Sequence, residues 1–215
     1  MPTAILIDGG FFLKRYRTIF ADDWMERTPT QVAEDLHKTM VKHLHDKSGE
    51  QVRELYRILY YDCPPLTKKL HKPISKQSYD AGKSREAQFR LGFFENLRRL
   101  RKVALRLGHL SDHIGWRLKP NAQKALLSQT RQIVDLTDDD FEIETRQKGV
   151  DMKIGVDIAS LAFKHQVDQI VLVAGDGDFV LDPMWATIPD DLHEHVDGLQ
   201  SMWPRPKPRS RVEPK

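Results

Sequence analysis

Two short apolar runs constrain the fold most, because neither alternates between apolar and polar residues. Residues 3–7 form the first run, and residues 170–174 form the end of the second, within a strand predicted over residues 167–174. A strand that is apolar at successive positions is covered on both faces, as in a parallel sheet enclosed by helices. Asp8 follows the first run directly, and Asp176 and Asp178 follow the second. These aspartates are therefore predicted at the carboxyl ends of parallel strands.

The segments between these runs alternate between helical and strand-like patterns. Strands are predicted over residues 54–61 and 141–145, and helices over residues 30–45, 84–107, 118–131 and 150–163. Such alternation predicts an α/β domain with a mainly parallel sheet. We expect this domain to span residues 1–200, followed by a disordered basic tail, rich in proline and arginine, over residues 201–215.

Composition excludes several classes of protein. A single cysteine, Cys63, rules out an internal disulfide and suits a reducing compartment. We find neither a signal peptide nor an apolar run long enough to cross a membrane, so a soluble, cytoplasmic protein is expected. Zinc is rejected because there is no thiolate set, and because His193 and His195 point apart at helical spacing. Phosphate-loop and dinucleotide-binding glycine motifs are also missing from the sequence.

Several carboxylates are predicted to converge on one site. Asp151 opens the helix predicted over residues 150–163, whereas Asp157 lies about 120° further around the same helix. Carboxylates held together repel one another unless a hard cation such as Mg²⁺ joins them, and such an ion activates water against a phosphodiester. Lys148 precedes this helix and could hold a phosphate. In the alternative interpretation, each aspartate is only a helix cap or a turn residue.

Basic residues suggest where a polyanion would bind. The net charge is only +3, so any attraction for nucleic acid depends on where the charges lie. Arg98, Arg99 and Lys102 lie on the helix predicted over residues 84–107, whose surface could follow a phosphate backbone. The alternative is a solvated helix face. A second basic stretch, residues 68–76, is predicted as a loop near Tyr79, which could stack on a base.

Three segments together resemble a known family. AILIDGGFF, QKGVDMKIGVDIASLA and DQIVLVAGDGDFV are similar to the signature segments of the NYN domain, within the PIN-like nucleases, and most similar to its bacterial LabA-like branch. The resemblance implies a Rossmann-like, PIN-like three-layer domain that cleaves RNA with Mg²⁺ or Mn²⁺. It implies metal-binding and catalytic roles for Asp8, Asp151, Asp176 and Asp178, with Asp157 as a weaker match. Gly9, Gly10 and Phe11 stand where many members carry an asparagine.

The segment after Val180 departs from the family pattern. Relatives continue with a helix and a further parallel strand, whereas LDPMW follows here almost at once, and a parallel crossover needs about a dozen residues. We therefore expect one helix–strand unit to be missing after Val180, leaving a sheet edge that could pair with a second copy in a homodimer. The alternatives to a ribonuclease are a catalytically impaired RNA-binding or regulatory module and a Mg²⁺-dependent phosphohydrolase for small molecules.

Overall fold

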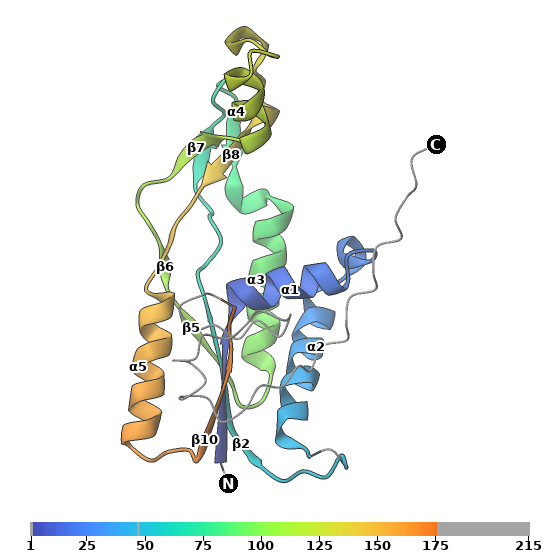
Figure 1. Ribbon diagram of the computed structural model, residues 1–215, viewed down its shortest axis with the longest axis vertical. Coiled ribbons are helices and arrows are strands. Elements are labelled where there is room, and N and C mark those ends of the chain that lie inside the picture. The colour runs from blue at the N-terminus through green and yellow to red at the C-terminus, as the bar shows by residue number, and fades with distance from the viewer. Residues whose placement is uncertain (1, 47, 176–215) are drawn as a thin grey trace.

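The computed structural model describes residues 2–46 and 48–175, and a four-stranded parallel sheet forms its centre. The strands lie in the order β10-β1-β2-β5, with β1 central and β5 at one side (Figure 1). Their bounds are β1 Pro2–Asp8, β2 Glu54–Asp62, β5 Val103–Leu107 and β10 Gln169–Val173. The predicted α/β fold with a mainly parallel sheet is confirmed.

The register of the sheet brings the carboxyl ends of its strands together. Ile7 of β1 pairs with Val173 of β10, and Asp8 pairs with Tyr61 of β2. Asp62, the next residue of β2, pairs with Leu107, the last residue of β5. We call this end of the sheet the carboxyl edge. Ligands of open parallel α/β sheets bind at this edge.

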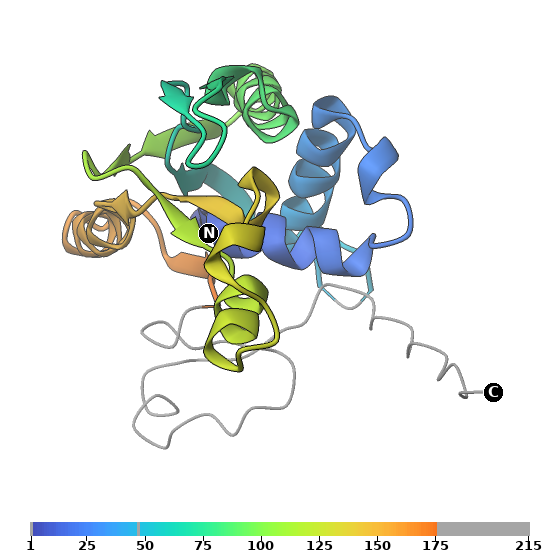
Figure 2. The same ribbon diagram turned by 90° about the horizontal axis from the view of Figure 1, so that it is seen from above.

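Helices cover both faces of the sheet. Helix α5 (Val150–Phe163) lies on one face, and α1, α2 and α3 lie on the other (Figure 2). Their bounds are α1 Gly9–Ile19, α2 Pro29–Val41 and α3 Arg85–Arg99. The predicted three-layer arrangement is therefore present.

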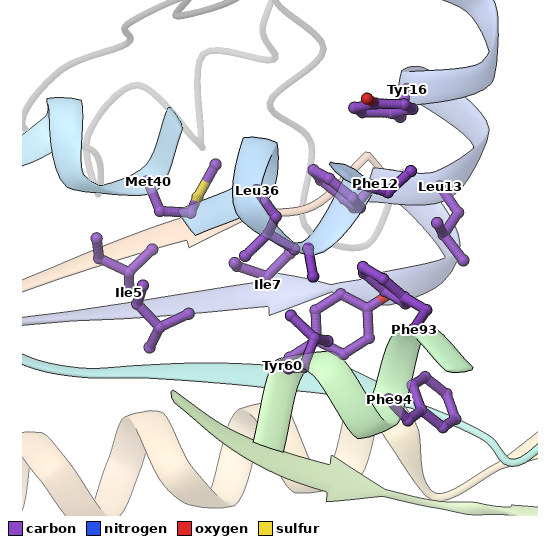
Figure 3. Packing of buried hydrophobic residues seen from close by; sticks show 14 of the residues in the cluster. Ile5, Ile7, Phe12, Leu13, Tyr16, Leu36, Met40, Tyr60, Phe93 and Phe94 are labelled. Atoms are coloured by element: carbon purple, nitrogen blue, oxygen red, sulfur yellow. The ribbon is translucent and has the colours of Figure 1, made fainter. Parts of the chain in front are cut away.

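Alternate residues of β1 supply the two hydrophobic cores. Ile5 and Ile7 are fully buried against Phe12 of α1, Leu36 of α2 and Phe93 of α3 (Figure 3). On the opposite face, Ala4 and Leu6 pack with Leu59, Tyr61 and, from α5, Ile154. Successive side chains of a strand point to opposite faces, so a run of apolar residues is what a sheet covered on both sides requires.

A second group of elements forms a lobe beyond the carboxyl edge, seen at the top of Figure 1 around β7, β8 and α4. It contains three antiparallel strand pairs and one helix, namely β3 (Lys69–His71) with β4 (Ser78–Asp80), β6 (His109–Leu110) with β9 (Gln147–Lys148), β7 (Gly115–Leu118) with β8 (Phe141–Glu144), and α4 (Pro120–Leu127). Short 3-10 helices complete the described elements, at Trp24–Glu26, Lys42–Leu44, Ala81–Lys83, Ile133–Asp135 and Asp138–Asp140.

The helix predicted over residues 84–107 is wrong in its last third. Helix α3 ends at Arg99, Leu100 is extended (φ −77°, ψ 134°), and Lys102 adopts a left-handed φ of 62°. The chain thereby reverses, and Val103–Leu107 becomes strand β5 beside β2. The spacing of Leu100, Ala104 and Leu107 continues the helical pattern, which is why a longer helix was predicted. Apolar residues in this segment are also compatible with a half-buried strand.

Several predictions concern residues outside the described ranges. They include the missing unit after Val180, the domain boundary at residue 200 and the tail over residues 201–215. None of the helices in the described ranges is long and apolar enough to span a membrane.

Candidate functional site

Asp8 ends β1 and begins α1 at the centre of the carboxyl edge. Its carboxylate accepts a hydrogen bond from the backbone N–H of Phe11 at 3.1 Å, so Asp8 is the N-cap of α1. Burial raises the pKa of this half-buried carboxyl above its ordinary 3.8, and the carboxylates of Asp151 and Asp62 raise it further. The backbone N–H groups of Phe11 and Gly10 lower it in part. Asp8 is therefore a helix cap, as the alternative interpretation predicts. Its carboxylate is also repelled by the carboxylates of Asp151 and Asp62.

Asp151 faces the same edge from the opposite layer. It lies in the first turn of α5, which starts after Gly149 with a left-handed φ of 80°. Its side chain is exposed, and its charge raises the pKa of both Asp8 and Cys63. Asp8 at the end of a strand and Asp151 at the start of a helix are thus close enough for the charge of Asp151 to raise the pKa of Asp8.

Asp62 is a third acid at this edge, and it is not among the predicted site residues. It is fully buried as the last residue of β2 and accepts a hydrogen bond from the N–H of Cys63 at 2.7 Å. It forms an ion pair with the guanidinium of Arg90, and it also accepts hydrogen bonds at 3.4 Å from the Tyr60 hydroxyl and from the side-chain amide of Gln147. The available signal was that β2, like β1, ends in an aspartate.

Arg90 brings a positive charge to the carboxyl edge from α3. One terminal nitrogen donates to Asp62 and, at 3.2 Å, to the carbonyl of Cys63. The Nε atom is buried and has no hydrogen-bond partner among the described residues. Buried polar groups usually have a hydrogen-bond partner, so this donor lowers the stability of the fold. The fold nevertheless places Arg90 beside Asp62.

The chain reaches the remaining predicted acids through Gly175. A methyl group at this position would overlap the ring of Phe11, so residue 175 lies directly against the first turn of α1. Only glycine permits this close approach without displacing the ring. Asp176 and Asp178 follow at once but lie outside the described residues. Phe11, one of the residues that stand where many family members carry an asparagine, thus has a packing role.

Asp157 and Lys148 occupy different surroundings. Asp157 accepts a hydrogen bond from the Tyr61 hydroxyl at 2.8 Å and pairs with Arg106 Nε at 3.0 Å, which ties α5 to β2 and β5. Lys148 is exposed on β9, directly across from His109 of β6. Lys148 is therefore close in the chain to Asp151 and accessible at the base of the lobe.

Three of the basic residues predicted to bind substrate, Arg98, Arg99 and Lys102, lie at the other end of the sheet. Lys102 Nζ donates to the carbonyl of Leu55 at the start of β2. Asp62 is at the far end of that nine-residue strand, seven residues beyond Leu55 and therefore about 23 Å away at ~3.3 Å per residue. Arg98 and Arg99 are in the last turn of α3, just before Lys102, and Arg98 pairs with Glu95 at 2.5 Å. The structure does not bring these three residues to the acids.

At the carboxyl edge, two carboxylates without a cationic partner among the described residues fit a hard divalent ion. Within residues 2–46 and 48–175, no three histidine, cysteine, aspartate or glutamate side chains are grouped so as to hold a metal. Asp8 and Asp151 remain as neighbouring acids, since Asp62 is neutralised by Arg90. Mg²⁺ needs only one or two direct carboxylates and keeps several waters, so the donor set suits it.

Comparison with known proteins finds one family that is similar to part of the chain. The model of the NYN domain family matches residues 93–182, a range that includes Asp151, Asp176 and Asp178, whereas Asp8 precedes it. The match does not distinguish branches, so the LabA-like assignment stays a prediction. Neither the search of curated proteins nor the search of solved structures finds a match. The signature segments, the parallel sheet with acids at its carboxyl edge and this match over residues 93–182 support the resemblance of the chain to the NYN domain family.

Proposed function

We propose that this protein is a metal-dependent endoribonuclease that cleaves RNA phosphodiester bonds at the carboxyl edge. The observation that carries the proposal is Asp8, a half-buried acid whose pKa is raised by burial and by neighbouring carboxylates. Like charges held together are typical of functional sites, where a cation or a substrate group offsets them. Similarity of residues 93–182 to the NYN domain, which has a PIN-like nuclease fold, supports RNA as the substrate.

We assign the ligand role to Asp8 and Asp151 and, from the family motif, to Asp176 and Asp178. A bound Mg²⁺ or Mn²⁺ would activate a water molecule and stabilise the leaving oxygen of the phosphodiester. Asp8 is held by the first turn of α1 and Asp151 by the first turn of α5, so the two acids are positioned by rigid elements. Lys148, which is exposed and three residues before Asp151 in the chain, would bind a phosphate of the substrate. Asp157, bound to Tyr61 and Arg106, supports α5 instead.

A second candidate is an RNA-binding or regulatory NYN module without efficient catalysis. The observation that favours it is that Arg90 occupies the third acid of the edge, so the described residues contribute only two free carboxylates. Association of two copies along β10 and a cytoplasmic location also stay predictions. Within the described sheet, β10 pairs on one side only, with β1.

Incubation of the purified protein with a mixed RNA pool separates the two candidates. We expect internal cleavage with Mn²⁺ or Mg²⁺ and none with EDTA, and we expect Asp8→Asn to slow cleavage by about 10²-fold or more, since loss of groups merely supporting a metal ligand already costs about 10–100-fold. Asp168→Asn is the matched control, because Asp168 is exposed at the amino-terminal end of β10, with its N–H bonded to the carbonyl of Pro2. RNA binding without cleavage in either metal would favour the non-catalytic module.

A further inference from the structure

The lobe carries a cluster of lysines that the proposed site does not use. Residues 64–83 contain five lysines and one aspartate. Four of these lysines are exposed, and they lie on β3, on β4 or on residues beside these strands. We call residues 68–83 the lysine ribbon. The four are Lys68, Lys69, Lys76 and Lys83.

These four charges are not neutralised within the described residues. None of their ammonium groups is within 4.0 Å of a carboxylate there, and only Lys72 approaches one, Asp138, at 4.0 Å. Asp80 lies across from Lys69 in the strand pair, but its carboxylate accepts the N–H of Gly82 at 3.1 Å. Exposed lysines without acidic partners at close spacing create a positive potential that attracts a polyanion.

The lysine ribbon is held in place rather than being the loop that the sequence predicted. The carboxylate of Asp138 accepts the N–H of Ile74 at 3.0 Å and the hydroxyl of Ser75 at 2.5 Å. The ring of Tyr79 packs edge-on against Trp116, with centroids 5.9 Å apart, and Trp116 Nε1 donates to the carbonyl of His71 at 2.8 Å. Tyr79 therefore braces the ribbon. A surface ordered before binding loses less entropy when a ligand arrives.

A groove links the carboxyl edge to the lysine ribbon. It has a volume of about 260 Å³ and lies between residues 64–68 and the residues from Gly108 to Ile114. One wall begins two residues after Asp62, and the other begins directly after β5, where the N–H of Gly108 donates to the carbonyl of Asp62 at 2.8 Å. Lys68 lines its outer end. Small-molecule sites are typically clefts or cavities of about 300–1,000 Å³, so this groove is slightly smaller than such sites.

The base of the groove is built by close packing. A methyl group at Gly108 would lie 2.5 Å from the carbonyl oxygen of Lys148, so β9 passes directly beside the start of β6. The backbone of Lys148 is thus beside the groove, Lys68 lines it, and Lys69 follows Lys68 in the chain.

We propose that the lysine ribbon binds the RNA backbone next to the scissile phosphate and that the groove guides the strand between them. This inference rests on the proposed function for the choice of RNA. It places the electrostatic contact at the carboxyl edge, whereas Arg98 and Arg99 are at the opposite end of the sheet. Each neutralised phosphate releases counterions, so the salt dependence of binding counts the contacts.

The test compares two variants that each lose two positive charges. Binding of a fluorescent single-stranded RNA of about 16 nucleotides, the upper site size for comparable folds, is measured in EDTA over a range of salt concentrations. Lys68→Ser/Lys69→Ser should lower the slope of log affinity against log salt by about 1.4, from ~0.7 per phosphate contact. Arg98→Ser/Arg99→Ser should leave it unchanged. Melting curves that match the parent show that both variants are folded.

Three outcomes would overturn the inference. They are a parental slope in the lysine variant, an equal loss in the arginine variant, and no binding of RNA by the parent. Because EDTA prevents metal-dependent cleavage, this readout is independent of catalysis. If the protein binds RNA through the lysine ribbon but never cleaves it, the nuclease proposal is refuted and the RNA-binding role of the lysine ribbon is retained.

Discussion

Arg90→Met is expected to lower the free energy of unfolding by about 3–5 kcal/mol, because it leaves a buried carboxylate without its partner. Asp62 is 0% exposed and the Arg90 side chain 17% exposed, so water cannot replace the lost ion pair. Urea denaturation followed by circular dichroism measures the change. The hydrogen bonds that remain come from neutral donors, namely the N–H of Cys63 at 2.7 Å and the side chains of Tyr60 and Gln147 at 3.4 Å, and they are too weak to stabilise an isolated charge there.

Two controls make this prediction specific. Arg98→Met on the same helix removes an exposed pair with Glu95, with side chains 51% and 61% exposed, and should cost less than about 1 kcal/mol. Asp62→Asn combined with Arg90→Met should recover part of the loss, since no unpaired charge remains. A loss below about 1 kcal/mol for Arg90→Met alone would show that the ion pair does not hold α3 against β2.

Asp8→Asn is expected to stabilise the metal-free protein at neutral pH while abolishing its function. Asparagine keeps the N-cap hydrogen bond to α1 and removes the charge. The folded protein raises the pKa of Asp8 above 3.8, so the folded state holds this proton more tightly than the unfolded state does. The ionised carboxylate therefore opposes folding above its folded pKa, and this cost disappears as the pH falls below 3.8, where both states are protonated.

The measurement is the melting temperature in EDTA at neutral pH and at pH values below 3.8. Asp8→Asn should melt higher than the parent at neutral pH, and the difference should vanish in acid. Asp140→Asn is a control of opposite sign, because Arg131 and the backbone of Thr137 hold the pKa of Asp140 below its ordinary value. That variant should melt lower at neutral pH. A parent that melts higher than Asp8→Asn at neutral pH without metal would contradict the repulsion described for this edge.

Most of the central sheet could be predicted because its signals are local. The apolar runs that became β1 and β10 and the helix over Val150–Phe163 depend on neighbouring residues alone. Strand β5 could not be predicted, because the left-handed turn at Lys102 and the edge position beside β2 decide it, and helical spacing extended through the same residues. Helix α1 was missed because Gly9 and Gly10 suggested a turn, whereas the cap from Asp8 lets the helix begin there.

The candidate site was partly predictable for a similar reason. Asp8 and Asp151 followed from the rule that parallel strands present ligand-binding residues at their carboxyl ends. Asp62 required knowledge that β2 is the neighbour of β1 and that Arg90 reaches it from α3. The placement of Arg98, Arg99 and Lys102 depended on the direction of α3, which runs from the carboxyl edge to the opposite end of the sheet. Charge clustering in the sequence contains no information about that direction.

Calorimetric titration of Mn²⁺ into the protein tests the central claim most directly, because it measures the metal site without a substrate. The parent and the control Asp168→Asn are expected to bind the ion with equal affinity. Asp8→Asn, Asp151→Asn and Asp176→Asn should each weaken binding by at least about tenfold, given that supporting groups alone cost 10–100-fold. Melting curves recorded under the same conditions verify that each variant is folded. If folded Asp8→Asn binds Mn²⁺ as tightly as the parent, Asp8 is not a ligand and the carboxyl edge is not the metal site.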